Sequence, residues 1–312
     1  MGHKIITVTL NPCIDKTIIV NGFTEGGLNR AERVRTDAGG KGINVAKVLK
    51  NFGNDVLAVG VMGDHGRETL IAELDERRIK HRFLTVPGTI RTNYKLYNKE
   101  TKHITEINEP GFTVAEEELD PVLSLINEGM EEAGVLVLSG SVAPGFSEDI
   151  YKELIVRAKE KKVRVVLDAE GEHLRRGLEA APFAIKPNLY ELELFIGRKI
   201  SGICDVLACG EKILEQGIAL LVVSMGEKGA VCMTQNERYY VKPPAVQCKS
   251  TVGAGDSMVA AMAYGLAQKM SIKTIACMAT AAGTITATKE GTEVCDFHEV
   301  QDFSKKLLVE SL

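Results

Sequence analysis

The chain is 312 residues long and carries 38 Lys and Arg against 42 Asp and Glu, so its formal net charge at pH 7 is −4. Hydrophobic residues make up 45% and charged residues 26% of the sequence, which is ordinary for a globular protein with a full core and excludes a disordered or collagen-like chain. A slightly acidic chain without a basic run also lacks the clustered cations that nucleic-acid binding requires.

The first residues and the cysteines indicate where the protein works. The start MGHKIITVTLNPCID enters a strand-like apolar run directly, without the regions of a secretory signal. No stretch approaches the roughly 18 uninterrupted apolar residues of a membrane span. The 7 cysteines are an odd number without a C-x-x-C pair, which indicates free or buried thiols in a reducing compartment. We therefore expect a cytoplasmic protein with neither a membrane nor a nucleic-acid partner.

Runs rich in Val, Leu and Ile alternate with amphipathic helical stretches along the chain. This alternation is typical of a mostly parallel sheet covered by helices on both faces, a three-layer α/β/α fold. In chain order, the pattern predicts a helix over 40–52, a strand over 133–139, a helix over 148–161, strands over 163–168, 184–186 and 219–224, a strand-like run over 239–248 and a helix over 258–268. Without repeats or a Pro- or Ser-rich linker, we expect one domain spanning 1–312.

Two segments of the N-terminal third break this rhythm. Residues 17–37 and 90–109 predict short, more polar strands with Gly or Asn turns. We interpret them as a small sheet that acts as a lid or dimer clasp, with lid strands drawn from about 16–37 and 90–109. A pair of ordinary edge hairpins fits the same sequence equally well.

The most informative motif is Thr251-Val252-Gly253-Ala254-Gly255-Asp256-Ser257, which opens the last predicted helix. Its small residues allow a tight turn, so free N–H groups and the positive end of the helix dipole can face an anion. An acid beside such an anion is unfavourable unless it accepts a proton from a nucleophile, which favours Asp256 as a general base. The alternative is that Asp256 only caps the helix.

A second glycine cluster, Gly39-Gly40-Lys41-Gly42-Ile43-Asn44, opens the predicted helix over 40–52. It is not a P-loop, because Arg35 stands at the first glycine position and Gly42 follows the lysine. A cation at Lys41 and an amide at Asn44 suit a phosphorylated small molecule.

Two further motifs each allow two interpretations. Asn188 and Glu191 lie three residues apart at a helix start, where they can hold a hydrated Mg²⁺ or form a capping box. The segment Ser224 to Gly229 can wrap nucleotide phosphates or make a hairpin. These motifs, Ser139-Gly140-Ser141 and the Asp256 motif all follow apolar runs. We therefore expect them in one crevice at the carboxyl ends of the strands.

Together these residues resemble the PfkB (ribokinase-like) family of carbohydrate kinases over nearly the whole chain. The two signature regions are the stretches from Gly39 to Ala46 and from Thr251 to Ser257. Within the family, the resemblance is strongest to members that phosphorylate fructose 1-phosphate, and next to tagatose-6-phosphate kinases. It is carried by Thr9-Leu10-Asn11-Pro12 with Asp15, by Arg91-Thr92-Asn93, by the stretch from Thr105 to Gly111 and by Ser139-Gly140-Ser141.

The resemblance implies ATP-dependent phosphorylation of a sugar phosphate, with fructose 1-phosphate as the expected acceptor and tagatose 6-phosphate or fructose 6-phosphate as alternatives. It implies that Asp256 is the base and that the amides of Gly253, Ala254, Gly255 and Asp256 form an anion hole. The implied sugar-phosphate ligands are Asp15, Gly40, Lys41, Asn44, Arg91, Asn93 and Ser139, with Arg30 reaching from a partner subunit. The implied ATP site comprises Lys186, Asn188, Glu191, Ser224, Gly226, Glu227, Gly229, Thr251, Gly253, Gly255 and Gly283, with Mg²⁺ held through water by Asn188 and Glu191. The resemblance further implies a homodimer through the lid, and it leaves a monovalent cation open.

Overall fold

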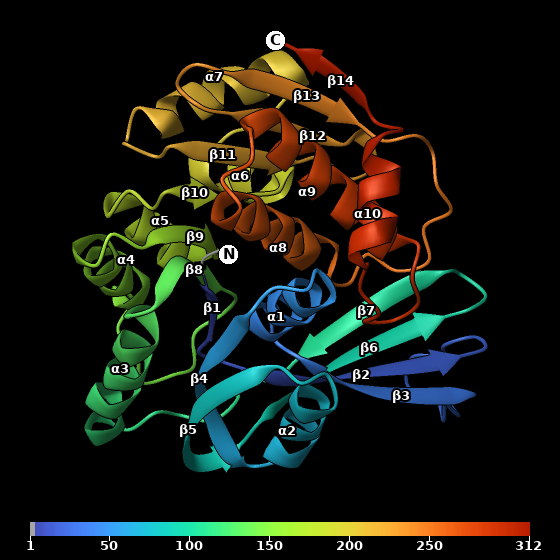
Figure 1. The fold of residues 1–312 in the computed structure, drawn as a ribbon. Helices are drawn as coiled ribbons and strands as arrows, with labels where there is room; N and C mark the ends of the chain where they lie inside the picture. The colour runs from blue at the N-terminus through green and yellow to red at the C-terminus, as the bar shows by residue number, and fades with distance from the viewer. Residues whose placement is uncertain (1–3) are drawn as a thin grey trace.

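The computed structural model describes residues 4–312 and contains a ten-stranded sheet and a separate four-stranded sheet (Figure 1). The large sheet has the strand order β14-β13-β12-β11-β10-β9-β8-β1-β4-β5. Its strands are β1 Lys4–Thr9, β4 Val56–His65, β5 Lys80–Thr89, β8 Ala133–Ser139, β9 Arg164–Asp168, β10 Ala184–Ile185, β11 Leu220–Ser224, β12 Ala230–Met233, β13 Arg238–Lys242 and β14 Leu308–Ser311. All pairings from β5 to β11 are parallel, and those from β11 to β14 are antiparallel.

Helices cover both faces of the large sheet and bury its two apolar surfaces. The helices are α1 Lys41–Asn51, α2 Arg67–Glu76, α3 Glu116–Met130, α4 Ile150–Glu160, α5 Gly171–Glu179, α6 Leu189–Ile196, α7 Ile203–Leu214, α8 Ala254–Ala267, α9 Ile272–Ala287 and α10 Phe297–Ser304, with a 3-10 turn η1 over Gly226–Lys228. One core lies under α1, α2, α8, α9 and α10, and the other under α3 to α7. The expected three-layer arrangement is confirmed.

The central strands are buried because nearly every side chain on them is apolar. In β8 the segment from Val135 to Leu138 is at most 1% exposed, as expected for a parallel strand with helices on both sides. Helices α8 and α9 pack unusually closely, since a Cβ on Gly265 would lie only 2.6 Å from Cγ1 of Ile275. Nearer the N-terminus of α8, a Cβ on Gly283 of α9 would lie 2.7 Å from Cγ of Met258, so the two helices also pack closely at that end.

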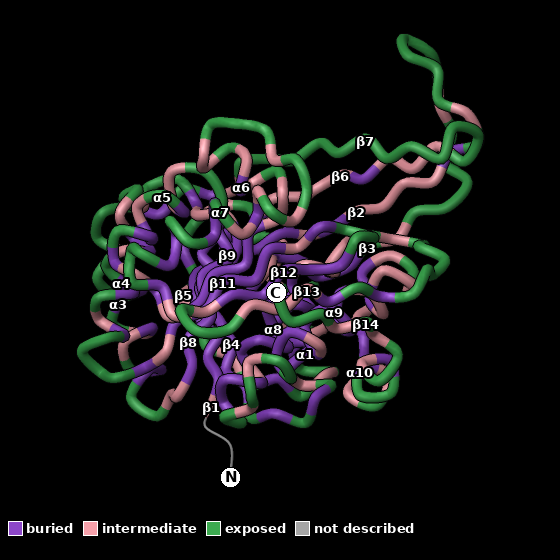
Figure 2. The backbone as a smooth tube through the Cα atoms, turned by 90° about the horizontal axis from the view of Figure 1, so that it is seen from above, coloured by how far each residue is buried: buried purple, intermediate pink, exposed green. Residues whose placement is uncertain are grey.

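The small sheet is built from the two segments that broke the sequence pattern. Its order is β3-β2-β6-β7, with β2 Cys13–Val20, β3 Arg33–Gly39, β6 Arg91–Asn98 and β7 His103–Asn108. Strand β2 pairs parallel to β6, while β3 and β7 flank them in antiparallel pairings. Figure 2 shows the sheet as an arm that projects from the body and is exposed at its far end. The expected small sheet is present, and β2 begins a few residues before the predicted bound.

Three predicted boundaries were wrong. The strand expected over 239–248 ends at Lys242, because Pro243 and Pro244 have no N–H to continue the ladder. The helix expected over 258–268 begins at Ala254, so the glycine motif forms its first turn. The two-residue strand β10 ends before Lys186.

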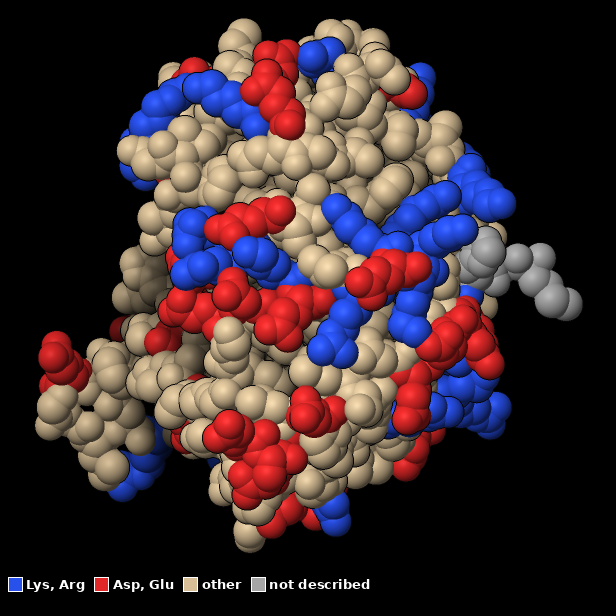
Figure 3. Space-filling view, turned by 90° about the vertical axis from the view of Figure 1, so that its left-hand side faces the viewer, with Lys and Arg blue, Asp and Glu red and all other residues tan. Residues whose placement is uncertain are grey.

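The surface carries mixed charge. On the side shown in Figure 3, Lys and Arg lie among Asp and Glu. One such surface ion pair, Lys152–Glu179 at 2.7 Å, joins α4 to α5. Among the described residues, no helix is long and apolar enough to span a membrane. The seven cysteines form no disulfide in this part of the chain.

Candidate active site

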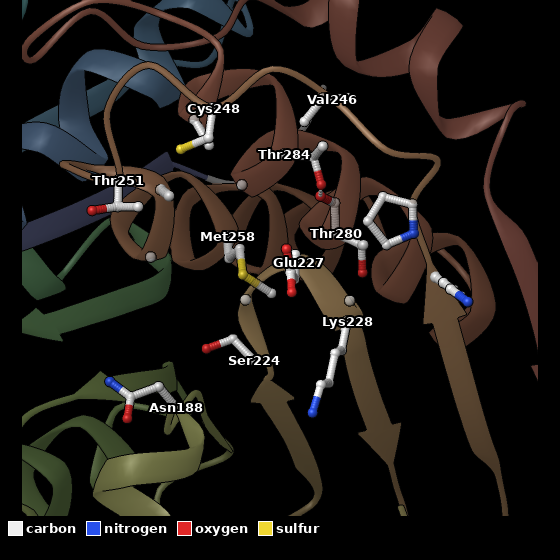
Figure 4. A pocket seen from close by; sticks show the side chains of 18 of the residues that line it. Asn188, Ser224, Glu227, Lys228, Val246, Cys248, Thr251, Met258, Thr280 and Thr284 are labelled. Carbon is white, nitrogen blue, oxygen red and sulfur yellow. Dashed lines mark hydrogen bonds between the residues drawn. The ribbon is translucent and has the colours of Figure 1, made fainter. Parts of the chain in front are cut away.

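Two adjoining cavities open at the carboxyl edge of the large sheet. One has a volume of about 870 Å³ and lies among β11, η1, the loop after β13, α8 and α9 (Figure 4). The other, of about 380 Å³, lies between the large sheet, the small sheet and the starts of α1 and α8. Four residues line both cavities: Lys186, Asn188, Thr251 and Gly255. We call the first the large cavity and the second the polar cavity.

The strand ends supply the floor of the polar cavity. Thr9 ends β1, Ser139 ends β8, Asp168 ends β9 and Lys186 follows β10, and all four line the polar cavity. These strands run parallel, so their carboxyl ends meet at one edge. The expected crevice is therefore present.

The first turn of α8 forms the wall between the cavities. Gly253 precedes the helix with φ +75°, a left-handed conformation that favours glycine. Asp256 lies in the first turn and makes no capping hydrogen bond, so the interpretation of this residue as a helix cap was wrong. The free N–H groups of this turn and the carboxylate of Asp256 thus lie at the same cavity edge.

Asp256 is buried yet faces the polar cavity. Its side chain accepts a hydrogen bond at Oδ2 from Nδ2 of Asn44 at 2.8 Å, and the residue is only 6% exposed. Burial raises its pKa to about 6, although the nearby ammonium of Lys41 acts in the opposite direction. A carboxylate with this pKa is ionised at neutral pH and accepts a proton readily.

A buried carboxylate holds two lysines across the site. Asp168 lies 3.6 Å from Nζ of Lys41 and 3.4 Å from Nζ of Lys186. Burial alone would raise the pKa of Asp168, but the two ammonium groups outweigh it and keep this pKa below its ordinary value. Asp168 in turn raises the pKa of Lys41. Lys41 therefore stays charged at the edge of the polar cavity, and Lys186 lies beside the same carboxylate.

The polar cavity carries unused hydrogen-bonding capacity. Within residues 4–312, a buried side-chain oxygen without a hydrogen-bond partner occurs on several residues that line it: Thr9, Asn11, Asn44, Asn93 and Ser139. A buried polar atom without a partner is costly, and such atoms gathered around one cavity indicate that a polar ligand satisfies them. The cavity therefore suits a molecule rich in hydroxyl and anionic oxygens.

The small sheet closes the polar cavity with charged groups. Lys95 of β6 lies 3.2 Å from Oδ1 of Asp15 on β2, and Asn93 donates to the same oxygen at 3.5 Å. At the base of β6, Nη2 of Arg91 donates to Oγ of Ser141 at 2.9 Å. The small sheet thus contributes both a carboxylate and cations to the cavity.

The large cavity has the size of a small-molecule site. Figure 4 shows Ser224, Glu227 and Lys228 from the β11–β12 connection facing Met258, Thr280 and Thr284 from α8 and α9. Its volume lies within the range of small-molecule sites. Gly226 borders open space, and an added Cβ on Gly229 would collide with the carbonyl of Val241. The segment from Ser224 to Gly229 makes an antiparallel hairpin and also lines the cavity, so the hairpin interpretation is confirmed and nucleotide binding by this segment stays a prediction.

Asn188 and Glu191 form the capping box that was one of the two expected arrangements. Oδ1 of Asn188 accepts from N of Glu191 at 2.8 Å, and Oε2 of Glu191 accepts from N of Asn188 at 2.9 Å. Within the described chain, no three His, Cys, Asp or Glu residues are placed to hold a metal directly. The second Glu191 oxygen remains free of these bonds, and such a donor set fits Mg²⁺ held through water.

All but one of the predicted site residues line one of the two cavities. The polar cavity is lined by Asp15, Gly40, Lys41, Asn44, Arg91, Asn93, Ser139, Glu191, Gly253 and Asp256. The large cavity is lined by Ser224, Gly226, Glu227, Gly229, Ala254 and Gly283. The remaining four predicted residues line both cavities: Lys186, Asn188, Thr251 and Gly255. Arg30 is exposed on the loop between β2 and β3, outside both cavities of its own chain, so its role toward a partner subunit stays a prediction.

Several lining residues escaped the sequence interpretation. Asp168 and Lys95 carry charge into the polar cavity, and Thr280, Thr284 and Val246 line the large one. Asp168 carried a usable signal, because it is an acid that directly ends a buried strand. The α9 residues gave none, because nothing local marks which face of a small-residue helix meets a cavity.

Comparison with known proteins agrees with this geometry. A family model described as pfkB family carbohydrate kinase matches residues 8–298. The chain belongs to this family. A PfkB kinase transfers phosphoryl groups from ATP, generally with Mg²⁺, so the protein is an ATP-dependent sugar kinase.

Individual PfkB relatives indicate the class of substrate. A 1-phosphofructokinase of Xanthomonas campestris pv. campestris is 38% identical over 270 residues, 85% of each chain. A 1-phosphofructokinase of Escherichia coli (strain K12) is 33% identical over 296 residues, 95% of each chain. The crystal structure of phosphofructokinase-2 from Escherichia coli in complex with potassium matches with a TM-score of 0.89 at 28% identity, covering 98% of this chain and 99% of that chain. These relatives support a sugar-phosphate kinase.

Proposed function

We propose that this PfkB kinase transfers the γ-phosphoryl group of ATP to fructose 1-phosphate and forms fructose 1,6-bisphosphate and ADP. The observation that carries the proposal is the position of Asp256: a buried carboxylate at the N-terminus of α8, on the polar side of the junction between the two cavities. In the reaction, the acceptor hydroxyl oxygen forms a bond to phosphorus as the bond from phosphorus to the ADP oxygen breaks. The hydroxyl proton passes to Asp256.

The polar cavity is the proposed sugar-phosphate site. Its unpartnered oxygens suit sugar hydroxyls, and Asp15 offers a carboxylate that accepts hydrogen bonds from two of them. Arg91, Lys41 and Ser139 supply cations and a hydroxyl for the phosphate of the substrate. Lys41 already pairs with Asp168, but the Arg91 guanidinium donates to neutral oxygens, those of Asn11 and Ser141. A neutral sugar would leave the charge of Arg91 without an anionic partner, which favours a phosphorylated acceptor.

The first turn of α8 is the proposed anion hole. The proposed donors are the amides of Gly253, Ala254, Gly255 and Asp256 at the N-terminus of α8, where the helix dipole stabilises negative charge. In this structure the N–H of Ala254 donates to the carbonyl of Thr251 at 3.3 Å, so it would have to exchange that partner for the phosphoryl group. Lys186 lies beside this turn, since its Nζ is 3.5 Å from the position of a Cβ on Gly255. Fixed donors of this kind stabilise the charge of a transferring phosphoryl group without reorganising during the step.

The large cavity is the proposed ATP site. Its lining residues Ser224, Glu227 and Thr251 would surround the nucleotide, and Gly226, whose Cβ position faces open space, would allow its close approach to the backbone. Gly229 and Gly283 also line the cavity, where a side chain would collide with Val241 and Met258. Bound Mg²⁺ neutralises phosphate charge, and Asn188 and Glu191 would hold its waters.

The small sheet is the proposed lid and dimer contact. It supplies Asp15 and Lys95 to the polar cavity, and its far end, which includes Arg30, is exposed. One solved structure of phosphofructokinase-2 from Escherichia coli is of a tetrameric inhibited form, which supports oligomer formation in this family. The potassium in another structure of that protein motivates a comparison of activity in potassium and sodium salts.

The proposal is tested by measuring ADP release with a panel of acceptors. We expect the highest kcat/KM with fructose 1-phosphate, and ³¹P NMR of the product should show a second phosphomonoester on the same sugar. A much higher kcat/KM with tagatose 6-phosphate or fructose 6-phosphate would reassign the acceptor. No ADP release with any sugar phosphate would reject the kinase assignment in favour of a non-catalytic sensor.

A further inference from the structure

Arg35 is a charged residue of the small sheet that joins this sheet to the main body. It lies on β3 opposite Thr17 of β2, two residues from the Asp37–Asp15 pair. Its Nε donates to the Asp37 carboxylate at 2.9 Å, which fixes the direction of the guanidinium. Arg35 therefore sits on the strand pair that carries Asp15 into the polar cavity.

The guanidinium of Arg35 contacts the loop between α9 and α10 through a hydrogen bond and an ion pair. Nη1 donates to the carbonyl oxygen of Glu290 at 3.3 Å and lies 3.7 Å from the Glu293 carboxylate. An added Cβ on Gly291, where φ is +60°, would lie only 2.8 Å from Nη1. The backbone at Gly291 thus packs directly against the guanidinium. In Figure 1 this loop descends from α9 and α10 toward the small sheet.

The same two loop residues also hold the segment that leads into α8. Oγ of Ser250 donates to the carbonyl of Gly291 at 3.0 Å and accepts from N of Val252 at 3.2 Å. Lys249 pairs with the carboxylate of Glu290 at 3.5 Å. Val252 directly precedes Gly253, so these contacts place the residue at which the anion hole begins.

We propose that Arg35 is a positioning residue that couples occupancy of the sugar-phosphate site to the geometry of the anion hole. The coupling runs from β2 and β3 through Arg35 to Glu290 and Gly291, and from there through Ser250 to Val252. A sugar phosphate bound to Asp15 would fix the position of the small sheet, and Arg35 would then fix the loop between α9 and α10. This loop in turn positions the first turn of α8, which binds the transferring phosphoryl group. This inference rests on the proposed function, because it takes the polar cavity as the sugar site.

Coupling of this kind is reciprocal, so it is measurable as binding. A sugar phosphate should tighten the binding of a non-hydrolysable ATP analogue, and the analogue should tighten the binding of the sugar phosphate by the same factor. We expect at least a fivefold effect in the wild-type enzyme, within the usual range of such couplings. Isothermal titration with AMPPNP, with and without saturating fructose 1-phosphate, measures it.

Arg35→Met removes the contact while keeping much of the aliphatic stem. We expect the fivefold coupling to fall below twofold and kcat to fall about tenfold, with AMPPNP binding in the absence of sugar nearly unchanged. Arg33→Met is the matched control, because Arg33 is an exposed arginine two residues earlier on the same strand. It should retain the coupling of the wild type.

Ser250→Ala removes the hydrogen bond between Ser250 and the carbonyl of Gly291, which is the second contact of the proposed coupling. It keeps the proposal testable if Arg35→Met fails to fold. It should lower the coupling as well, and the double variant should lose no more than the larger single loss. Full coupling in Arg35→Met, or none in the wild type, would overturn the inference. If fructose 1-phosphate fails to bind the wild type, the proposed acceptor fails instead, and the same titrations are made with tagatose 6-phosphate.

Discussion

Replacement of Asp256 by asparagine is expected to remove catalysis and to stabilise the fold. The variant keeps the size of the side chain and an oxygen that can accept the hydrogen bond from Asn44, which is 2.8 Å long in the wild type. It loses the group that accepts the proton of the acceptor hydroxyl. Because a general base contributes about 10²–10⁴-fold, we expect kcat to fall by at least about a hundredfold.

The gain in stability follows from the pKa of Asp256. Burial raises this pKa from 3.8 to about 6, so the native state binds the proton more tightly than the unfolded chain does. The contribution of this group to the free energy of unfolding is therefore greatest below pH 4 and is lost as the pH rises through about 6. At pH 7.5 the ionised carboxylate costs about 3 kcal/mol, a cost that asparagine avoids in large part.

The assay is urea denaturation of wild type and Asp256→Asn at pH 7.5 and pH 4, with ATP binding as a test of the nucleotide site. The variant should be more stable by about 1–3 kcal/mol at pH 7.5 and nearly equal to the wild type at pH 4. ATP affinity should change little.

Asp168→Asn is the matched control, because its expected change in the free energy of unfolding at neutral pH has the opposite sign. The two lysines keep the pKa of Asp168 below its ordinary value, so its carboxylate stabilises the fold at neutral pH and loses this effect as the pH falls. Asp168→Asn should therefore be destabilised at pH 7.5. An Asp256→Asn enzyme that keeps most of its kcat, or that is destabilised like Asp168→Asn, would refute the reasoning.

Three further outcomes follow from the site. Below about pH 6 the kcat/KM of the wild type should fall tenfold per pH unit as Asp256 takes up a proton, and a flat profile down to pH 5 would contradict this. Arg91→Ala should raise KM for the sugar phosphate about 10–100-fold and KM for ATP far less. This corresponds to a loss of about 1.5–3 kcal/mol of binding free energy, typical of a hydrogen bond to a charged group. Equal effects on both KM values would show that Arg91 does not bind the phosphate of the sugar. Gly42→Ala would push a Cβ into the carbonyl of Val8, so urea denaturation should show a loss of about 1–3 kcal/mol, and an unchanged midpoint would show that α1 shifts freely.

Much of the fold was predictable because its signals are local. The stretch from Ala133 to Ser139 is a run of apolar residues, and it forms β8 with these bounds because a strand buried on both faces needs such a run. The segment over 239–248 misled the prediction, since its apolar residues continue past Pro243, which cannot donate to a ladder. The edge strand β14 is short and mostly exposed, so periodicity gave no sign of it.

The candidate site was predictable where its residues lie in motifs and not where they meet only in space. Asp256, Lys41 and Asn188 were found because each stands at a helix start beside small or turn-forming residues. The ion pair of Asp168 with Lys186 depends on β9 and β10 being neighbours in the sheet, and its ion pair with Lys41 depends on where α1 begins relative to β9. Periodicity gives neither. Likewise, the contact of Arg35 with Glu290 spans 255 residues and depends on where the small sheet folds back.

The most direct test of the central claim is a crystal structure of the wild-type enzyme with fructose 1-phosphate and a non-hydrolysable ATP analogue. We predict that the acceptor hydroxyl lies within about 2.6–3.2 Å of a carboxylate oxygen of Asp256, with the γ-phosphoryl group facing the first turn of α8. An acceptor hydroxyl held away from Asp256, or a γ-phosphoryl group bound elsewhere than at this turn, would contradict the account.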